Sequence, residues 1–501
     1  MYLWIVIVGG FISFYNSWGI GANDCANSFA TSVGSKVLTL KQAVIIAAVF
    51  EFLGAFLMGS HVTNTIRKKI VNLDVFEDTP EDLMLGMLCA NMSAGIWLHI
   101  ASYLKLPVST THSIVGAIVG FSLAYSGSGA IVWSGILKIV LSWFLSPVIS
   151  GIFALAFYSL LKRQVFLKEN GFEKTIYIFP LLTFFTFLIS SFFIIYKGTP
   201  QLNLDDIPLW IGILSSTIIA TTVGLLSWLL YIPYARRRMI APAAIIAPAA
   251  IIAPAAIISP TAIIASSEGP KLTRSNSYTN AMVIEPKLII KNLTIDENIA
   301  RLKNETKKLK DKRVANKIQL LHGNAVAIDD KIERLCSPLQ VITACFSSFA
   351  HGANDVANSI APYATIYAIY INDAITKKTD VPIWILFLGG SGIVLGLATW
   401  GYKVINRIGM ELTKITASRG FIIELSAALT VLIASRLELP VSTTHCQIGS
   451  VVGCGFGDKK NNVEWKLVRE IIYSWLITVP ITGMISAALF SYGYYSPGET
   501  I

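Results

Sequence analysis

The chain has 501 residues, of which 54% are apolar and only 14% are charged, and its mean hydropathy is +0.62. Soluble domains carry roughly 25% charged residues, so this composition excludes a water-soluble globular fold for most of the chain. The formal net charge is +10, and residues 235–336 alone contain 17 Lys and Arg against 9 Asp and Glu. A basic segment between apolar blocks is typical of a cytoplasmic loop. Nucleic-acid binding is disfavoured, because this segment is poor in aromatic residues and has no candidate core.

Long apolar runs begin at the first residue. No Lys or Arg precedes Lys36, so we predict a retained first span and not a cleaved signal peptide. A membrane-spanning helix needs about 20 mostly apolar residues, which predicts an all-α polytopic membrane protein with about twelve transmembrane helices. Several runs are rich in Gly, Ser and Pro, which indicates broken helices or re-entrant hairpins among them. The predicted spans lie near residues 2–22, 39–60, 83–104, 107–126, 130–161, 175–196, 208–234, 338–371, 381–403, 419–438, 440–457 and 467–494.

One further apolar run, residues 241–264, is predicted not to span the membrane. It repeats a six-residue pattern with one proline in each repeat, at Pro242, Pro248, Pro254 and Pro260. Each proline inside a helix costs about 3 kcal/mol, so we predict a low-complexity linker here. Residues 296–334 contain the run RLKNETKKLKDKRV and are predicted to form a charged, partly helical, solvated region.

Two motifs occur once in each half of the apolar sequence. GAND begins at Gly21 and again at Gly352, and PVSTTH begins at Pro107 and again at Pro440. The motifs are 86 residues apart in the first half and 88 in the second, which predicts two copies of one structural unit. The two GAND segments lie in the first and eighth predicted spans. This odd offset predicts that the copies cross the membrane in opposite senses, as in secondary transporters.

These observations divide the chain into five predicted parts. They are a first inverted repeat with one GAND and one PVSTTH motif, additional transmembrane spans, a basic low-complexity cytoplasmic loop, a second inverted repeat and a C-terminal transmembrane span. The respective ranges are 1–130, 131–235, 236–336, 337–457 and 458–501.

The GAND segments place acids at a depth where charge is unfavourable. An ionised Asp at mid-membrane costs at least about 2.5–3.5 kcal/mol, and no Lys or Arg lies in the first span or in either PVSTTH segment. We therefore predict that a cation from solution, sodium or a proton, neutralises these acids. The neighbouring amide oxygens are ligands that hard cations prefer. The predicted cation-binding residues are Asn23, Asp24, Asn27, Asn354, Asp355 and Asn358.

The PVSTTH segments have the residues of an anion site. A proline followed by three hydroxyl residues is typical of a helix N-terminus, with Pro107 and Pro440 in the first turn. The free backbone N–H groups and the helix dipole favour an anion there, so two such termini from opposed repeats predict a site for a tetrahedral oxyanion. Because the acids repel that anion, we expect bridging cations and hence coupled transport. The predicted anion-binding residues are Ser109, Thr110, Thr111, Ser442, Thr443 and Thr444.

Four other polar residues lie in apolar runs. His112 and His445 end the two PVSTTH motifs, and we expect structural hydrogen bonding from them and not proton relay. Glu51 and Glu424 are isolated intramembrane acids that do not align with each other, because Asn91 lies opposite Glu424. We interpret each acid as a cation-site or gating candidate, with a satisfied packing carboxyl as the alternative.

The six cysteines form no CxxC pair, and most lie in or beside apolar runs. We expect small packed side chains and not metal ligands or disulfides. They are Cys25, Cys89, Cys336, Cys345, Cys446 and Cys454.

At the GAND and PVSTTH motifs the chain resembles the inorganic phosphate transporter (PiT) family, whose members carry both elements in both halves. The resemblance covers nearly the whole chain outside residues 236–336. It implies a dimeric helical symporter that moves inorganic phosphate with sodium, or with protons in some members, by alternating access. It further implies that the asparagines and aspartates of the GAND motifs serve the cations, that the STT residues hold phosphate, and that Glu51 and Glu424 are transport-critical acids. Cys25 departs from the family, which usually has Val there, and Cys446 stands where the first copy has Ser113.

The leading hypothesis is therefore phosphate import by sodium symport across the plasma membrane, with sodium as co-substrate and no other cofactor. Proton-coupled symport and another oxyanion such as sulfate are alternatives within the same fold. A membrane receptor without a transport cycle is an alternative of a different class, and it predicts that the repeated polar residues tolerate apolar replacement. An enzyme is disfavoured, because the sequence offers no nucleophile–base pair and no metal-spaced His and Cys cluster.

Overall fold

The computed structural model describes residues 2–196, 207–240, 312, 314–376, 381–437, 439, 441–458 and 462–496. The chain divides into two compact units, Met1–Arg236 with Lys317–Ile501 and Arg237–Asn316. The predicted linker over 241–264 and the first part of the charged region over 296–334 lie outside the described residues. The fold described below is that of the first unit.

The elements of the described part of the first unit are all helices. Two residues between them, Val71 and Ile131, form an isolated β-bridge. The predicted all-α membrane fold is confirmed. Among the described residues, ten helical segments are long and apolar enough to span a membrane. They are Leu3–Cys25, Leu40–Gly59, Pro80–Tyr103, Thr110–Ala130, Trp133–Phe166, Gly171–Ile195, Leu209–Arg238, Ile383–Trp400, Ala417–Ala434 and Trp465–Tyr495.

Two of the predicted spans are not among these ten. The span over 440–457 corresponds to α16 (Thr443–Asp458), whose 16 residues rise about 24 Å, less than the roughly 30 Å of a bilayer core. The span over 338–371 is two helices, α11 (Asp330–Asp355) and α12 (Ala357–Asn372). The helix break occurs at the second GAND motif. The number of about twelve spans stays a prediction.

The first part of the chain contains one copy of each motif. Its elements are α1 (Leu3–Ile20), η1 (Gly21–Cys25), α2 (Ala26–Gly34), α3 (Leu40–Ile70), α4 (Pro80–Tyr103) and α5 (Thr110–Ser126). A capping box begins α3, because Thr39 and Gln42 each accept a hydrogen bond from the backbone N–H of the other. Pro80 begins α4, where its missing N–H leaves no hydrogen bond unmade.

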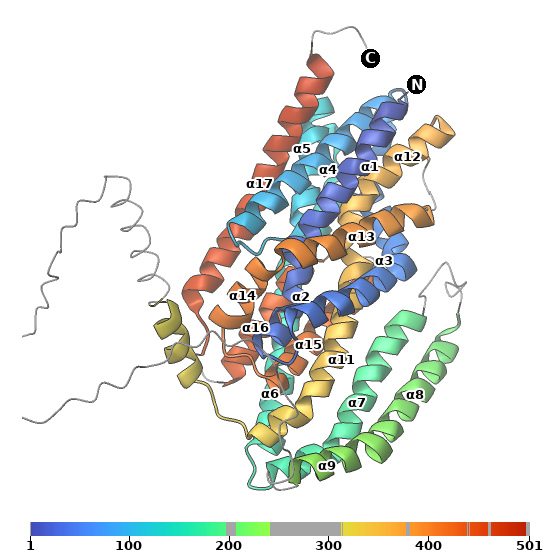
Figure 1. Cartoon of the computed structure of the whole chain (residues 1–501). Helices are drawn as coiled ribbons and strands as arrows, with labels where there is room; N and C mark the ends of the chain where they lie inside the picture. The colour runs from blue at the N-terminus through green and yellow to red at the C-terminus, as the bar shows by residue number, and fades with distance from the viewer. Residues whose placement is uncertain are drawn as a thin grey trace, which may run out of the picture. The chain divides into compact units, whose positions relative to one another are not determined.

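The remaining helices complete the unit. They are α6 (Trp133–Leu161), α7 (Gly171–Ile195), α8 (Leu209–Leu226), the first part of α9 (Ile232–Ile240) as far as Arg236, α13 (Ile383–Trp400), α14 (Tyr402–Glu411), α15 (Ala417–Arg436) and α17 (Trp465–Tyr495), in addition to α11, α12 and α16. Figure 1 shows α7 and α8 side by side, with α7 next to α11. In α15, 89% of the residues over Ala417–Ala434 are buried, so this helix lies at the centre of the unit.

Two helix pairs pack closely through glycine. α5 lies against α17, and α16 lies against α6. A Cβ atom at Gly120 would lie 2.1 Å from the carbonyl oxygen of Gly483, and one at Gly453 would lie 2.1 Å from that of Gly151. Such small-residue contacts let backbones approach closely and are common between helices in membranes.

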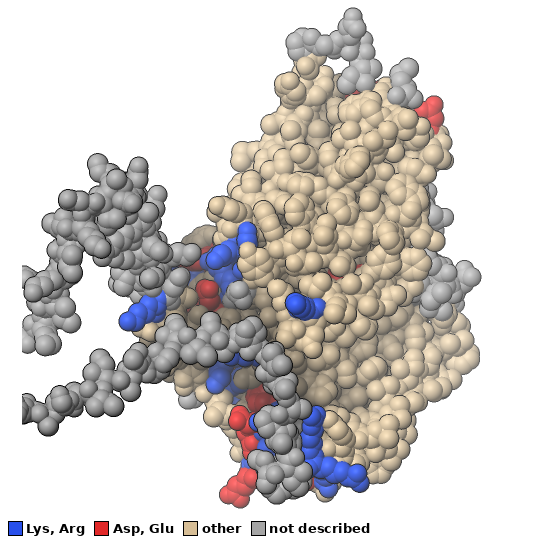
Figure 2. Space-filling model, in the orientation of Figure 1, with Lys and Arg blue, Asp and Glu red and all other residues tan. Residues whose placement is uncertain are grey.

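The outer surface is apolar over much of its area. Leu137, Leu141 and Phe144 on α6 are more than half exposed, which is unfavourable in water and suits contact with lipid. Figure 2 shows a broad face with few charged side chains, and most of the Lys, Arg, Asp and Glu in this view lie at its left side and its lower end.

Candidate functional site

Both GAND segments interrupt helices. Gly21–Cys25 forms one π-helical turn between α1 and α2, a feature that is frequent at functional sites, and the second motif is the last turn of α11, directly before the break at Val356 that separates it from α12. A Cβ atom at Gly21 would lie 1.8 Å from the carbonyl oxygen of Ile393 on α13, and one at Gly352 would lie 2.1 Å from that of Glu51 on α3. Glycine therefore allows a neighbouring helix to pass directly against each GAND segment.

The first asparagine of each motif holds the PVST segment of the same half. The Asn23 Nδ2 donates to the carbonyl oxygen of Leu106 at 2.9 Å, and its Oδ1 accepts from the N–H of Val108 at 3.0 Å. The Asn354 Nδ2 donates to the carbonyl oxygen of Val441 at 3.0 Å. These bonds place each PVST segment beside a GAND break.

Each PVSTTH motif leads into a helix, as predicted. α5 begins at Thr110, and the Ser109 hydroxyl accepts from the N–H of His112 at 3.2 Å, which caps the helix. The Ser442 hydroxyl accepts from the N–H of His445 at 3.2 Å in the same way at the start of α16. The two serines predicted to bind the anion are thus engaged as helix caps.

The proline of the first PVSTTH motif lies outside α5. The prediction that Pro107 occupies the first helical turn is wrong, because Ser109 caps the helix and Thr110 is its first residue. The Pro107 carbonyl oxygen instead accepts from the Ser474 hydroxyl of α17 at 3.2 Å. Pro440 lies outside the described residues.

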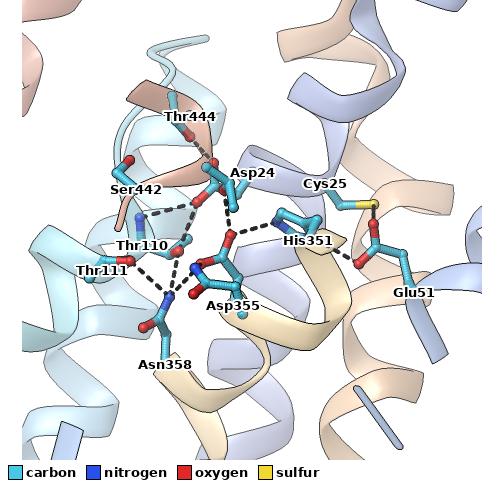
Figure 3. A network of polar contacts seen from close by, with 12 residues as sticks. Asp24, Cys25, Glu51, Thr110, Thr111, His351, Asp355, Asn358, Ser442 and Thr444 are labelled. Atoms are coloured by element: carbon cyan, nitrogen blue, oxygen red, sulfur yellow. Dashed lines mark hydrogen bonds and ion pairs between the residues drawn. The ribbon is translucent and has the colours of Figure 1, made fainter. Parts of the chain in front are cut away.

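Asp24 is buried between the two PVSTTH motifs (Figure 3). Its Oδ2 accepts from the Thr110 hydroxyl at 2.7 Å and from the Thr110 N–H at 3.3 Å, so the carboxylate occupies the N-terminus of α5. Its Oδ1 accepts from the Thr444 hydroxyl of α16. Hydroxyl groups from both halves of the sequence therefore hold one carboxylate.

Asp355 and Asn358 extend the same network from the second half. The Asp355 Oδ2 accepts from the Thr443 hydroxyl, and its Oδ1 accepts from Asn358 Nδ2 at 3.1 Å. The Asn358 Nδ2 also lies 2.9 Å from the hydroxyl oxygen of Thr110 and 3.3 Å from that of Thr111. The predicted cation-binding and anion-binding residues of both halves thus meet in one buried region.

His351 connects Asp355 to Glu51. Its Nδ1 lies 2.7 Å from Glu51 Oε2 and its Nε2 lies 3.1 Å from Asp355 Oδ2. A neutral imidazole has one N–H and donates to only one of these carboxylates, whereas an imidazolium donates to both. Figure 3 shows the ring between the two acids.

Sequence reasoning missed this histidine, although a signal was present. His351 directly precedes the second GAND motif, where the first copy has Ile20. The expectation that the GAND acids lack a charged partner within the chain considered only Lys and Arg. It overlooked the imidazole ring that contacts Asp355, and the same ring also contacts Glu51.

Glu51 and Glu424, the two isolated acids, lie in different surroundings. The Glu51 Oε1 accepts from the Ser348 hydroxyl at 3.0 Å, beside the His351 contact. The Glu424 carboxylate accepts from the hydroxyls of Thr31, of Ser32 at 2.6 Å and of Thr343 at 2.7 Å. These donors come from α2 and α11, so Glu424 is surrounded by hydroxyls that belong to neither STT motif.

The histidines that end the PVSTTH motifs make reciprocal contacts. His112 packs on Trp143 with ring centres 3.7 Å apart and ring planes tilted by 34°, and His445 stacks on Trp475 at the same distance. The His445 Nδ1 lies 2.9 Å from the Trp143 carbonyl oxygen, and the His112 Nδ1 lies 3.4 Å from that of Trp475. A carbonyl oxygen only accepts, so each Nδ1 is a donor. This is the structural hydrogen bonding expected from the sequence.

A small cavity adjoins the network. Its volume is about 10 Å³, room for about one water molecule, so the polar groups are closely packed around it. The residues that line it belong to η1, α2, α11, α15 and α16, and include Asp24, Ser28, His351, Val431, Thr443 and Gln447.

Seven of the twelve residues predicted to bind the cation or the anion therefore lie in one hydrogen-bonded network. Four others bond mainly to nearby backbone. The joined residues are Asp24, Thr110, Thr111, Asp355, Asn358, Thr443 and Thr444. Asn23, Asn354, Ser109 and Ser442 hold the local backbone, and Asn354 Nδ2 also donates to Asp355 Oδ1 at 2.9 Å. The side chain of Asn27 lies outside the described residues.

Buried acids surrounded by hydroxyl and amide groups, at the meeting point of two repeated motifs in a polytopic helical protein, define a membrane transporter and not an enzyme. The chain belongs to the phosphate transporter family, whose sequence model matches residues 20–486. It is 31% identical to sodium-dependent phosphate transporter 1 of Mus musculus, over 98% of this chain and 95% of the relative. It is also 31% identical to sodium-dependent phosphate transporter 2 of Xenopus tropicalis, over 98% of each chain.

A solved structure named the sodium-dependent phosphate transporter has the same fold. The TM-score is 0.73 at 30% identity, and the match covers 98% of this chain and 99% of the solved chain.

Proposed function

We propose that this chain imports inorganic phosphate by symport with sodium ions, in an alternating-access cycle carried out by two oppositely inserted repeats. The family to which the chain belongs transports phosphate, and the relatives described above are named sodium-dependent phosphate transporters. Their sodium dependence supports sodium over the proton as the coupling ion.

The observation that carries the proposal is that threonine hydroxyls of the PVSTTH motifs hydrogen-bond to the buried acids. Thr110 and Thr444 donate to Asp24, and Thr443 donates to Asp355. A hydroxyl has a single proton, so it cannot donate to a carboxylate and to a phosphate oxygen together. Sodium bound at the acids takes the place of the hydrogen bonds from these neutral hydroxyls, and the hydroxyls then turn to phosphate. Cation binding and anion binding are coupled for this reason.

In this mechanism the predicted residues take two roles. The acids and amides of the GAND motifs bind sodium, since carboxylate and amide oxygens suit hard cations. The hydroxyls of the STT motifs and the N-termini of α5 and α16 bind phosphate. Glu51 and Glu424 remain transport-critical acids in the proposal, Glu51 through its contact with His351. The residues are Asn23, Asp24, Asn27, Asn354, Asp355 and Asn358 for sodium, and Ser109, Thr110, Thr111, Ser442, Thr443 and Thr444 for phosphate.

The proposal also includes the topology and location of the protein. Reciprocal contacts of the two halves, such as the exchanged His–Trp pairs, support two related repeats. The excess of Lys and Arg over residues 235–336 supports a cytoplasmic position for that loop. A homodimer in the plasma membrane follows from the family resemblance.

Uptake of labelled phosphate into proteoliposomes tests the function, with sodium and proton gradients imposed separately and sulfate added as competitor. We expect uptake with the sodium gradient alone and no competition by sulfate. Uptake driven only by the proton gradient, or phosphate binding that is undiminished without sodium, would contradict the proposed coupling.

A substitution of Thr444 tests the hydroxyl mechanism. Thr444→Val removes one donor, and we expect the phosphate affinity to fall by roughly tenfold or more, as for loss of a hydrogen bond to a charged group. Thr444→Ser keeps the hydroxyl and should keep the affinity. Thr365→Val is the matched control, because the buried Thr365 hydroxyl donates to the Ala361 carbonyl oxygen of its own helix, at 2.9 Å.

A further inference from the structure

A second cluster of possible metal ligands lies beside the proposed sodium site. Cys25, Glu51 and His351 each offer one ligand atom, and these atoms lie within 4.8 Å of one another. The Cys25 Sγ is 3.3 Å from Glu51 Oε1, and the His351 Nδ1 is 2.7 Å from Glu51 Oε2. All three residues are buried, with exposures of 0%, 0% and 1%. In Figure 3 their side chains point toward one another from three different helical segments.

The donor set is that of a borderline-soft metal. Thiolate, imidazole and carboxylate are the zinc ligands of proteins, and Zn²⁺ binds them at about 2.0–2.3 Å in a tetrahedron. Two ligand atoms of such a tetrahedron lie about 3.3–3.6 Å apart, by the same bond lengths. The Sγ–Oε1 distance of 3.3 Å matches this spacing, and the shorter Nδ1–Oε2 contact is a hydrogen bond that the metal would replace. Sodium, a hard ion, prefers oxygen ligands and does not select a thiolate.

The surrounding groups are those that orient metal ligands. A ligating histidine commonly presents its other ring nitrogen to a carboxylate, and the His351 Nε2 lies 3.1 Å from Asp355 Oδ2. A ligating carboxylate is commonly hydrogen-bonded in turn, and Glu51 Oε1 accepts from the Ser348 hydroxyl at 3.0 Å. With the metal on Nδ1, the remaining proton of His351 is on Nε2, which lies beside Asp355 Oδ2.

We propose that Cys25, Glu51 and His351 form an inhibitory site for a thiophilic divalent cation such as Zn²⁺. Binding displaces two protons to solvent, the thiol proton of Cys25 and the proton of the hydrogen bond between His351 Nδ1 and Glu51 Oε2, and forms Zn–S, Zn–N and Zn–O bonds with a fourth position open to water. The expectation that the cysteines are only packed side chains does not hold for Cys25 in this proposal.

The site has no counterpart at the aligned positions of the other half. Val356 aligns with Cys25, and Ile20 aligns with His351. The bound metal would join η1 and α3 of the first half to α11 of the second. This inference rests on the proposed function in one respect: if transport moves the halves relative to each other, a metal that joins them stops the cycle.

Metal binding is tested first, without transport. Purified protein is titrated with Co²⁺, which reports a thiolate ligand through a near-ultraviolet sulfur-to-cobalt charge-transfer band. We expect the band for the unmodified chain and for Cys336→Ala, and its loss for Cys25→Val. Cys336 is a matched control, because it is also buried and lies on α11 about 22 Å from His351 at 1.5 Å per residue. Absence of the band in the unmodified chain, or its persistence in Cys25→Val, would overturn the site.

Inhibition is tested next, by sodium-driven phosphate uptake into proteoliposomes with Zn²⁺ added. We expect zinc to inhibit the unmodified chain and Cys336→Ala. Cys25→Val should transport normally without zinc and require at least about tenfold more zinc for half inhibition, as expected when a metal site is weakened. Equal zinc sensitivity of Cys25→Val and the unmodified chain would overturn the inhibitory role. If no preparation takes up phosphate, the proposed function fails while the cobalt titration still decides the metal site.

Discussion

The buried acids of this protein are surrounded by hydroxyl, amide and imidazole donors. Asp24 accepts from Thr110 and Thr444, and Glu424 accepts from Ser32 and Thr343. The hydroxyl and amide hydrogen bonds offset part of the unfavourable burial of a carboxylate, but these donors carry no net charge. In the proposed mechanism, sodium bound at the GAND acids adds the positive charge that such neutral donors do not provide.

Charge removal at the GAND acids tests this directly. Asp24→Asn and Asp355→Asn keep the shape of the side chain and remove the charge that attracts the cation. We expect sodium-driven phosphate uptake to fall to background for each variant, with normal amounts of protein at the cell surface. Asp74→Asn is the control, because it makes the same change from carboxylate to amide at an exposed residue that belongs to neither motif. Normal phosphate accumulation in either GAND variant would contradict the cation role.

His351 contributes to stability as well as to the site. His351→Ile introduces the residue of the first copy and leaves Glu51 and Asp355 without their imidazole partner. Breaking a buried charged pair destabilises by about 3–5 kcal/mol, so we expect a clearly lower melting temperature in detergent. His322→Gln is the control, because His322 is only partly buried and contacts the Met410 carbonyl oxygen. An unchanged melting temperature of His351→Ile would show that the ring does not stabilise the two acids.

Features of the site that depend on neighbouring residues can be predicted from the sequence, whereas contacts between distant segments cannot. The polar composition of the site and a helix start within the PVSTTH segment follow from the repeated motifs, whereas the exact start at Thr110, and not at Pro107, is set by the Ser109 cap. The place of His351 between two acids depends on how α3 packs against α11. That packing joins residues 300 positions apart, and no local pattern of the sequence encodes it.

At the scale of helices, each GAND motif packs closely against another helix through its glycine. Gly21 and Gly352 each lie directly against the backbone of another helix, so the motif begins with glycine for a steric reason. The sequence predicts broken helices from the Gly, Ser and Pro content. It does not predict that the partners are α13 for one glycine and α3 for the other, because these pairings arise only in the folded core.

Adding one methyl group at these positions tests the steric argument. Gly352→Ala would place a Cβ atom 2.1 Å from the Glu51 carbonyl oxygen, and overpacking typically costs 1–3 kcal/mol, more where backbone must move. We expect a lower melting temperature and reduced uptake for Gly352→Ala and likewise for Gly21→Ala. Gly129→Ala is the control, because a Cβ atom there has no neighbour within 4 Å. If all three variants melt together with the unmodified protein, the glycines are not required for packing.

At the scale of the whole chain, the site is assembled from both ends of the sequence. Thr444 contacts Asp24 across 420 positions, and Asn358 contacts Thr110 across 248. The matched motif spacing predicts that the two copies act together, and the structure places them in contact. The described site residues all belong to the unit formed by Met1–Arg236 and Lys317–Ile501.

The proline repeat over residues 241–264 provides the corresponding test of the chain's organisation. No candidate site residue lies in this segment, so replacing it with a Gly/Ser sequence of equal length should leave the sodium-driven uptake of phosphate and the melting temperature unchanged. The same replacement combined with Asp355→Asn should be inactive, which shows that the assay still reports the transport site. Loss of uptake by the replacement alone, with normal surface expression, would mean that the repeat takes part in transport. Retained uptake would place the whole of the transport chemistry in the helical unit that carries the two pairs of motifs.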